Sequence, residues 1–181
     1  TSPILKTGGV FLCLLIHEND YFVAMEFENS KLYKKANTIE QLSAKIVDLV
    51  NNYTEDDVAN LEYLKTQAQF IAEDSLRIPV KIAGAWNVEL YDIKMENAAI
   101  VRYSARQVRT HLMGLEIHGF KEIEYLDLLR KEIDEFRVLF AEWVKTFDQW
   151  NYIIDRWGLF NPPGVNYDDK DPDDDLPFNP P

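Results

Sequence analysis

A long seam of regularly spaced apolar side chains constrains the fold of this 181-residue chain more than any other feature. Large apolar residues recur at alternating intervals of three and four, at Leu126, Leu129, Ile133, Phe136, Phe140, Trp143, Phe147, Trp150, Ile154 and Trp157. This spacing lies on one face of an α-helix and predicts a helix from Glu122 to about Trp157, roughly 50 Å long at 1.5 Å per residue. Its aromatic side chains are too bulky for a two-stranded coiled coil, so we expect other helices or a sheet to pack on them. Trp143 and Trp150 should both be largely buried, either within the chain or across an oligomer interface.

The first third of the chain has a pattern typical of β-strands. Val10–Ile16 is a short apolar run, and His17–Asp20 provides a polar turn. Residues 21–28 then alternate as a half-buried strand does. Lys31–Lys35 can form a third strand. In the middle of the chain, Val80–Lys94 alternates again and predicts a further strand or hairpin.

Three other segments show helical periodicity. Thr38, with Gln41 three residues later, forms a capping box that starts a helix. A second helix is expected from Thr54 to Pro79, because proline disrupts the interior of a helix. A third is expected over Met95–Gly119.

These patterns together predict an α+β fold. It would consist of N-terminal antiparallel strands plus long helices, with an extended acidic C-terminal tail. We expect a single α+β domain over residues 1–160, in which 1–53 form a β-rich unit with the first helix and 54–160 are mainly helical. Residues 161–181 would form the extended tail, rich in Pro and Asp.

Composition limits the class and location of the protein. A hydrophobic content of 46% is enough for a sizeable core. The one cysteine, Cys13, lies in an apolar run and cannot form an internal disulfide, which indicates a reducing compartment. No run approaches the roughly 18 to 20 apolar residues that a membrane span needs. We therefore expect a cytoplasmic protein that does not enter a membrane.

Few motifs in the sequence suggest chemistry. Arg106 and His111 have the Arg-x4-His spacing seen in helical HEPN ribonucleases, but strands do not belong in that fold, so His111 is interpreted as an ordinary helix residue. Asp169, Asp171 and Asp173 match the first positions of a calcium loop, yet the later Gly and Glu are absent. We predict no catalytic, cofactor-binding or metal-binding residues.

Two short stretches resemble known families. Asp-Asp-Asp-Leu-Pro-Phe is similar to the acidic tip of bacterial single-stranded-DNA-binding proteins, in which carboxylates meet a basic rim and Pro-Phe enters an apolar pocket. That resemblance implies a partner-binding segment made of Asp173, Asp174, Asp175, Leu176, Pro177 and Phe178. Residues 10–50 also resemble the strand–strand–strand–helix core of HicB-type antitoxins.

From these features we expect a non-enzymatic cytoplasmic interaction or assembly protein that uses the aromatic helix seam and the acidic tail. The partner is another protein or a second copy of the chain, so a homo-oligomer is one alternative. Leu176 and Phe178 would pack into apolar pockets, and we favour pockets of this protein or its own oligomer over those of a different protein. The first alternative function is a nucleic-acid-linked protein, either antitoxin-like or a recruiter of replication and repair enzymes. A second alternative is an enzyme of unrecognised type.

Charge provides a test of direct nucleic-acid binding. The net charge is −12, of which residues 165–181 contribute −5 from six Asp and one Lys, leaving −7 for the rest. Because binding to phosphate backbones requires clustered cations, we expect no salt-dependent binding to random single- or double-stranded DNA. Filter binding near physiological ionic strength checks this, and submicromolar affinity that falls steeply with salt would contradict it.

Overall fold

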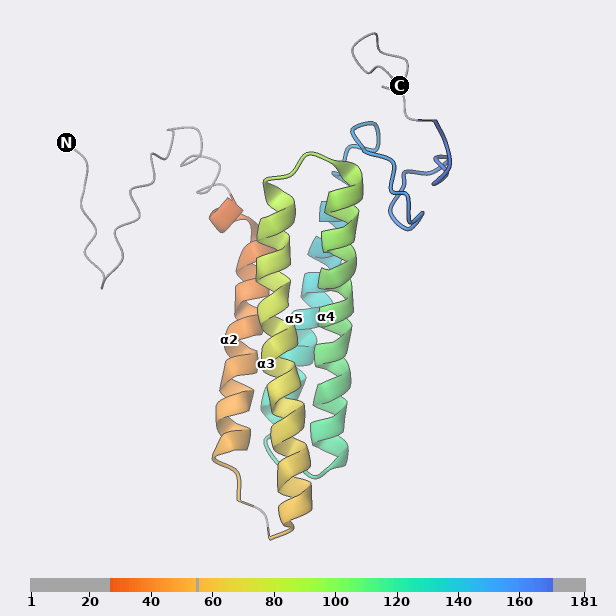
Figure 1. Ribbon diagram of the computed structural model, residues 1–181. Helices are drawn as coiled ribbons and strands as arrows, with labels where there is room; N and C mark the ends of the chain where they lie inside the picture. The colour runs from red at the N-terminus through yellow and green to blue at the C-terminus, as the bar shows by residue number, and fades with distance from the viewer. Residues whose placement is uncertain (1–26, 55, 171–181) are drawn as a thin grey trace, which may run out of the picture.

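The computed structural model describes residues 27–54 and 56–170, which form an antiparallel four-helix bundle (Figure 1). Its helices are α2 (Lys31–Asn51), α3 (Val58–Trp86), α4 (Tyr91–Ile117) and α5 (Ile123–Val144). Each helix packs on its neighbours in the chain, and α5 returns to α2, which closes the ring. Short connections join successive helices, as expected for antiparallel neighbours in a bundle.

The predicted α+β class is wrong, because the described residues contain helices and no strand. Lys31–Lys35 lies within α2, and Val80–Lys94 divides between the end of α3, a short connection and the start of α4. The first predicted strand, Val10–Ile16, and most of 21–28 lie outside the described residues, while Phe27 and Glu28 are helical. The strand–strand–strand order required by the antitoxin resemblance is therefore not met at Lys31–Lys35.

Helical periodicity outweighs the short alternating runs in these segments. Leu32, Ala36 and Ile39 are buried at intervals of four and three, so residues 31–35 belong to an apolar stripe that continues along α2. Ser30 caps this helix, with its hydroxyl oxygen accepting from the Tyr33 backbone N–H at 3.2 Å. The predicted cap, Thr38, lies inside the helix and donates its hydroxyl to Lys34 O.

Pro79 lies inside α3, although the sequence predicted that it would end the helix. An internal proline costs about 3 kcal/mol because it removes one backbone hydrogen bond and crowds the preceding turn. Ile82 and Ala85, one and two turns later, are fully buried. Burying one Ile side chain contributes roughly 1.5–3 kcal/mol, so packing of this last stretch offsets the cost.

The core consists of apolar side chains from all four helices. Among the buried residues are Ile39 and Ile46 of α2, Leu64 and Ile71 of α3, Val108 and Leu112 of α4, and Leu129 and Phe136 of α5. One end of the bundle is filled by Phe120, which follows α4 and packs against Tyr53 at 5.4 Å between ring centroids. Gly119 precedes it with a φ of 82°, a backbone conformation that glycine adopts without strain.

Helix α5 ends at Val144, well before the predicted end near Trp157. The Thr146 and Phe147 N–H groups donate to carbonyls three residues back, which tightens the last turn. The Thr146 hydroxyl also donates to Trp143 O, and Asp148 accepts from the Trp150 N–H. These polar side chains offer the backbone local hydrogen bonds that compete with a continued helix.

The aromatic seam is consequently divided. Leu126 to Phe136 form part of the core, and Trp143 is half-buried with its ring edge-on to Phe147 at 4.8 Å. Trp150 is 90% exposed and Trp157 is 91% exposed. Burial of Trp150 within the chain is therefore excluded, and its burial across an oligomer interface stays a prediction.

Residues 145–170 form an irregular segment that is attached to the start of α4 (Figure 1). The Tyr91 N–H donates to Asn151 O at 2.7 Å, and the Ile153 N–H donates to Asp92 Oδ1 at 3.1 Å. Ile154 is buried nearby. The chain is thereby held at the end of the bundle where α4 begins and α5 ends.

Two charged side chains shape the rest of this segment. Asp155 accepts hydrogen bonds from the backbone N–H groups of Phe160, Trp157 and Leu159, which lowers the pKa of its carboxyl. The Arg156 guanidinium donates to Tyr167 O at 3.0 Å and to Asp169 O at 2.7 Å. The last described residues are thus fixed to the turn that follows Ile154.

The divided seam predicts unequal effects of two aromatic substitutions. Phe136→Ala should lower the free energy of unfolding by about 3–5 kcal/mol, because Phe136 is buried in the core. Trp150→Ala should change it by no more than about 0.5 kcal/mol, since that ring is exposed. Urea unfolding monitored by circular dichroism checks both, and similar losses in the two variants would contradict the structure.

Candidate functional site

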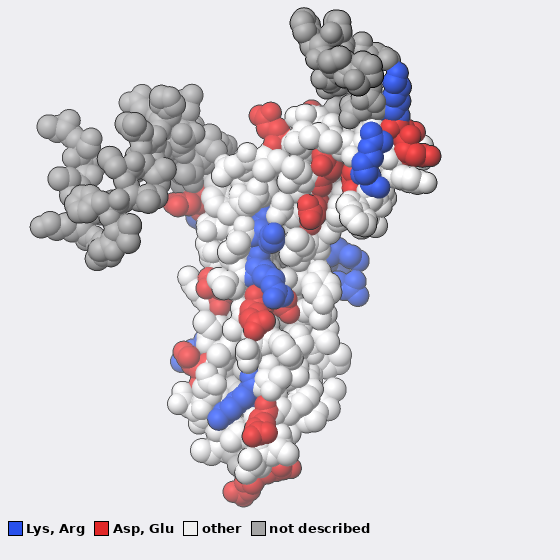
Figure 2. All heavy atoms as spheres, viewed as in Figure 1, with Lys and Arg blue, Asp and Glu red and all other residues white. Residues whose placement is uncertain are grey.

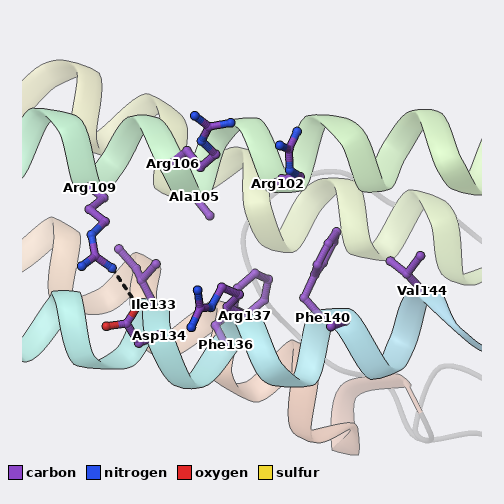
Figure 3. A pocket seen from close by; sticks show the side chains of 11 residues that line it. Arg102, Ala105, Arg106, Arg109, Ile133, Asp134, Phe136, Arg137, Phe140 and Val144 are labelled. Atoms are coloured by element: carbon purple, nitrogen blue, oxygen red, sulfur yellow. Dashed lines mark hydrogen bonds and ion pairs between the residues drawn. The ribbon is translucent and has the colours of Figure 1, made fainter. Parts of the chain in front are cut away.

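A groove of about 610 Å³ runs between α4 and α5 (Figure 3). Its walls come from Arg102, Ala105, Arg106, Arg109, Ile133, Asp134, Phe136, Arg137, Phe140, Ala141 and Val144. Helices α4 and α5 are the least closely packed of the neighbouring pairs in the ring. The groove therefore occupies the weakest contact of the bundle.

Helical spacing brings these side chains together. Arg102, Arg106 and Arg109 are separated by four and three residues, which places them on one face of α4. On α5 the same spacing aligns Ile133 with Phe140 and Val144. Phe140 and Val144 project from α5 toward α4 in Figure 3.

The floor of the groove is apolar. Ile133 and Phe136 are buried, and Phe140 is half-buried. Ala105 and Ala141 contribute only methyl groups to the lining. Small side chains at these two positions leave space that larger residues would fill, so an apolar surface remains accessible.

The rim of the groove is cationic. Four of the chain's seven arginines line it, and all four are exposed. Asp134 is the only acidic lining residue, so the lining carries a net charge of +3 (four Arg, one Asp). By contrast, the face shown in Figure 2 carries cations and carboxylates side by side, over broad uncharged areas.

One of these arginines already has a partner. The Arg109 guanidinium donates to Asp134 Oδ1 at 2.7 Å, which links the two helices across the groove (Figure 3). Among the described residues, the guanidinium groups of Arg102, Arg106 and Arg137 make no hydrogen bond or ion pair. These three groups are available to an anionic ligand.

Ion pairs attach α5 to both of its neighbouring helices. Arg130 pairs with Glu116 of α4 and with Asp127, toward the end of the bundle where α4 finishes. On the other side, Lys35 of α2 donates to Glu132 at 2.6 Å and to Glu135. The pKa of the Lys35 ammonium group is raised, mainly by its hydrogen bond to Glu132. Both attachments lie in the first part of α5, and most of the groove lining on α5 comes after them.

A second polar cluster lies between α3 and α4. Buried Asp74 accepts from Arg77 at 2.8 Å and from the Ser104 hydroxyl at 3.2 Å. His111 Nε2 lies 3.8 Å from Asp74 Oδ2, and its Nδ1 lies 2.7 Å from Gln67 Oε1. Burial lowers the pKa of His111, while the charge of Asp74 opposes that shift. These contacts satisfy the polar groups of the helix interface.

The Arg-x4-His pattern does not form one site in this structure. The absence of strands from the described residues removes the sequence-based objection to a helical ribonuclease. However, Arg106 lines the groove against α5, whereas His111 contacts Gln67 and Asp74 of α3. The two side chains lie on different faces of α4 and cannot act on one substrate atom together.

A smaller hollow of about 410 Å³ lies beside the start of α4. Its carboxylates come from Asp92, Glu96 and Asp155. Asp92 and Asp155 already accept backbone N–H groups that shape residues 151–160. Within residues 27–54 and 56–170, no group of three or more His, Cys, Asp or Glu side chains is arranged to hold a metal ion.

The sequence-predicted binding residues, Asp173 to Phe178, lie outside the described residues. The groove itself was missed. The intervals between Arg102, Arg106 and Arg109 were a usable signal, because they place three cations on one helix face. Arg137 was a second signal, because it lies between the seam positions Phe136 and Phe140.

Comparisons with known proteins identify no relative: no protein-family model matches this chain, and neither a curated protein nor a solved structure matches it. In the part of the chain that the structure describes, no helix combines the length and apolarity needed to cross a membrane.

The burial of His111 predicts a pH effect on stability. Because the folded pKa is lowered, the unfolded chain binds a proton more readily, and stability should fall as pH drops below about 6.5. His111→Gln should remove this part of the decline between about pH 7.5 and about pH 5.5. Urea unfolding at both values measures it, with exposed His118→Gln as the control. An unchanged pH dependence in His111→Gln would contradict the assignment.

Proposed function

We propose that this chain is a non-enzymatic interaction or assembly protein whose α4–α5 groove holds a protein segment in which carboxylates flank apolar side chains. The observation that carries the proposal is the grouping of four arginines around an apolar floor in a chain with a net charge of −12. Elsewhere the chain has only three arginines. Their concentration at the groove indicates that anions are recognised there.

The chemistry of the lining determines the kind of ligand. Guanidinium groups form paired, planar hydrogen bonds with carboxylates, and three of these groups have no partner among the described residues. The floor beneath them is made of Ile, Phe, Val and Ala side chains. A ligand must therefore supply both negative charge and apolar surface.

The length of the groove favours an extended segment over a small anion. Arg102 and Arg109 are seven residues apart, about 10 Å along α4, so the cations do not converge on one point. On α5 the lining extends from Ile133 to Val144, about 16 Å. Roughly five residues of extended chain span that distance at 3.3 Å each. Several separate carboxylates on one segment would meet several separate arginines.

The lining also supports a binding role over catalysis. Asp134 is its only residue that could act as a general base, and Arg109 holds that carboxylate in an ion pair. The arginines stay charged at any physiological pH and cannot transfer protons. The single cysteine of the chain supports a cytoplasmic setting for the interaction.

A labelled synthetic peptide tests the proposal. The probe is a fluorescein-labelled peptide in which Asp residues flank one Leu and one Phe. Arg106→Glu with Arg137→Glu should weaken its binding about tenfold or more, because two attractive charges become repulsive. Lys45→Glu with Lys65→Glu is the matched control, since it makes the same charge change at exposed positions of α2 and α3. Fluorescence anisotropy measures each affinity.

Two further peptides separate the contributions. Replacing Asp by Lys, or Leu and Phe by Ser, should each reduce binding to the unmodified chain. Equal binding by all three peptides, or equal loss in the groove and control variants, would overturn the proposal. Displacement of the probe by single-stranded DNA but not by excess unlabelled peptide would instead favour a nucleic-acid-linked function.

A further inference from the structure

We infer that the groove is occupied by the chain's own C-terminal segment, residues 171–181, with its carboxylates on the arginines and Leu176 and Phe178 on the apolar floor. This inference rests on the proposed function, because it names the source of the acidic, apolar segment. It also adds a regulatory property, since any partner would then have to displace the segment.

Charge and side-chain type match between groove and segment. Residues 171–181 contain four Asp and no Lys or Arg, a charge of −4, against +3 for the groove lining. Leu176 and Phe178 are the two large apolar side chains of the segment other than its prolines. They follow the three adjacent carboxylates directly, so one short stretch presents both features that the groove requires.

The position of the last described residues places the segment within reach. Hydrogen bonds from Tyr91 and Ile153 hold the preceding loop at the start of α4, and Arg156 holds the Tyr167 and Asp169 carbonyls. Figure 1 shows the described chain ending beside that end of the bundle. Val144, the last residue of α5, lies at the end of the groove nearest to it.

The segment is long enough to enter the groove. Eleven extended residues span at most about 36–40 Å. Arg102 lies eleven residues after Tyr91, about 16 Å along α4. Asp175 and Phe178 lie five and eight residues after Lys170, so they reach at most about 16–18 Å and about 26–29 Å from it. Residues 175–178 can therefore lie along the lining that begins with Arg102 and Val144.

Covalent attachment favours this occupant over a free one. A short tether gives a segment an effective concentration in the millimolar range at a site within its reach. Weak intrinsic affinity is then enough for high occupancy. Four prolines within residues 171–181 also limit the freedom that the segment loses on docking.

The test compares the full chain with a full-length variant carrying Leu176→Ser and Phe178→Ser. In ¹⁵N-labelled protein, the substitution should shift the amide signals of Ala105, Arg137, Ala141 and Val144. Signals at the opposite end of the bundle, such as Leu61 and Ile117, should stay unchanged. Shifts that appear only on concentration, together with a dimer mass in sedimentation, would overturn docking within one chain and assign the segment to a second copy.

A free peptide of residues 171–181 provides the second measurement. It should bind the Leu176→Ser and Phe178→Ser variant and restore the shifted groove signals, and it should bind the unmodified chain about tenfold more weakly or worse, because the attached segment competes. In the charge-reversed chain Arg106→Glu with Arg137→Glu, binding should be lost, and a peptide with Asp173→Lys and Asp174→Lys should recover it.

The outcomes distinguish this inference from the proposed function. If neither the substitution nor the peptide affects the groove signals while the generic Asp/Leu/Phe peptide still binds there, the self-docking inference fails and the proposed function stands. If no acidic peptide binds the groove in either chain, both fail.

Discussion

Burial of the apolar stripe of α5 is the constraint on which the rest of the structure depends. Leu126, Leu129, Ile133 and Phe136 close the ring by covering the apolar faces of α2 and α4, so without α5 those faces would meet water. The apolar spacing continues to Trp157, but the helix that carries it ends at Val144. Once Thr146 and Asp148 take over the backbone hydrogen bonds, the helix ends. Of the later seam residues, Phe147 and Ile154 stay buried at the end of the bundle, whereas Trp150 and Trp157 become exposed.

The groove follows from how α5 meets α4. Four guanidinium groups repel one another, and only Arg109 has a carboxylate partner across the gap. Closing the two helices around Arg102, Arg106 and Arg137 would bring these charges together and remove them from water without compensation. The Lys35 pairs with Glu132 and Glu135 attach the opposite side of α5 to α2, and this contact opposes movement of α5 toward α4. A ligand with carboxylates would supply the missing compensation.

The parts of the fold that the sequence predicted correctly are those in which one period persists over several turns. The stripe through Leu126 and Phe136 and the helix over most of Met95–Gly119 have that property, and both are helices here. Lys31–Lys35 is too short for its period to be read alone, and Val80–Lys94 contains a helix end, a connection and a helix start. Burial of Leu32 and Ile82 in the core favours the helical structure of these segments. The groove could not be predicted while α4 and α5 were not known to be neighbours. A row of arginines on one helix becomes a site only when an apolar surface lies opposite.

The acidic character of the whole chain does not oppose recognition of an acidic segment at the groove. At physiological ionic strength the field of an exposed charge decays over about 8 Å, so distant carboxylates contribute little at the floor. Arg102, Arg106 and Arg137 lie on the groove itself, and they therefore dominate the potential that a bound segment experiences. At low ionic strength, where screening is weaker, the net charge of −12 repels free anions and lowers their rate of approach. A tethered segment avoids that penalty because it never leaves the vicinity. The arginines thus attract an acidic segment at the groove, while the net negative charge of the chain slows the approach of a free one. This combination favours a segment that is attached to the chain, or one whose apolar side chains keep it bound on the groove floor.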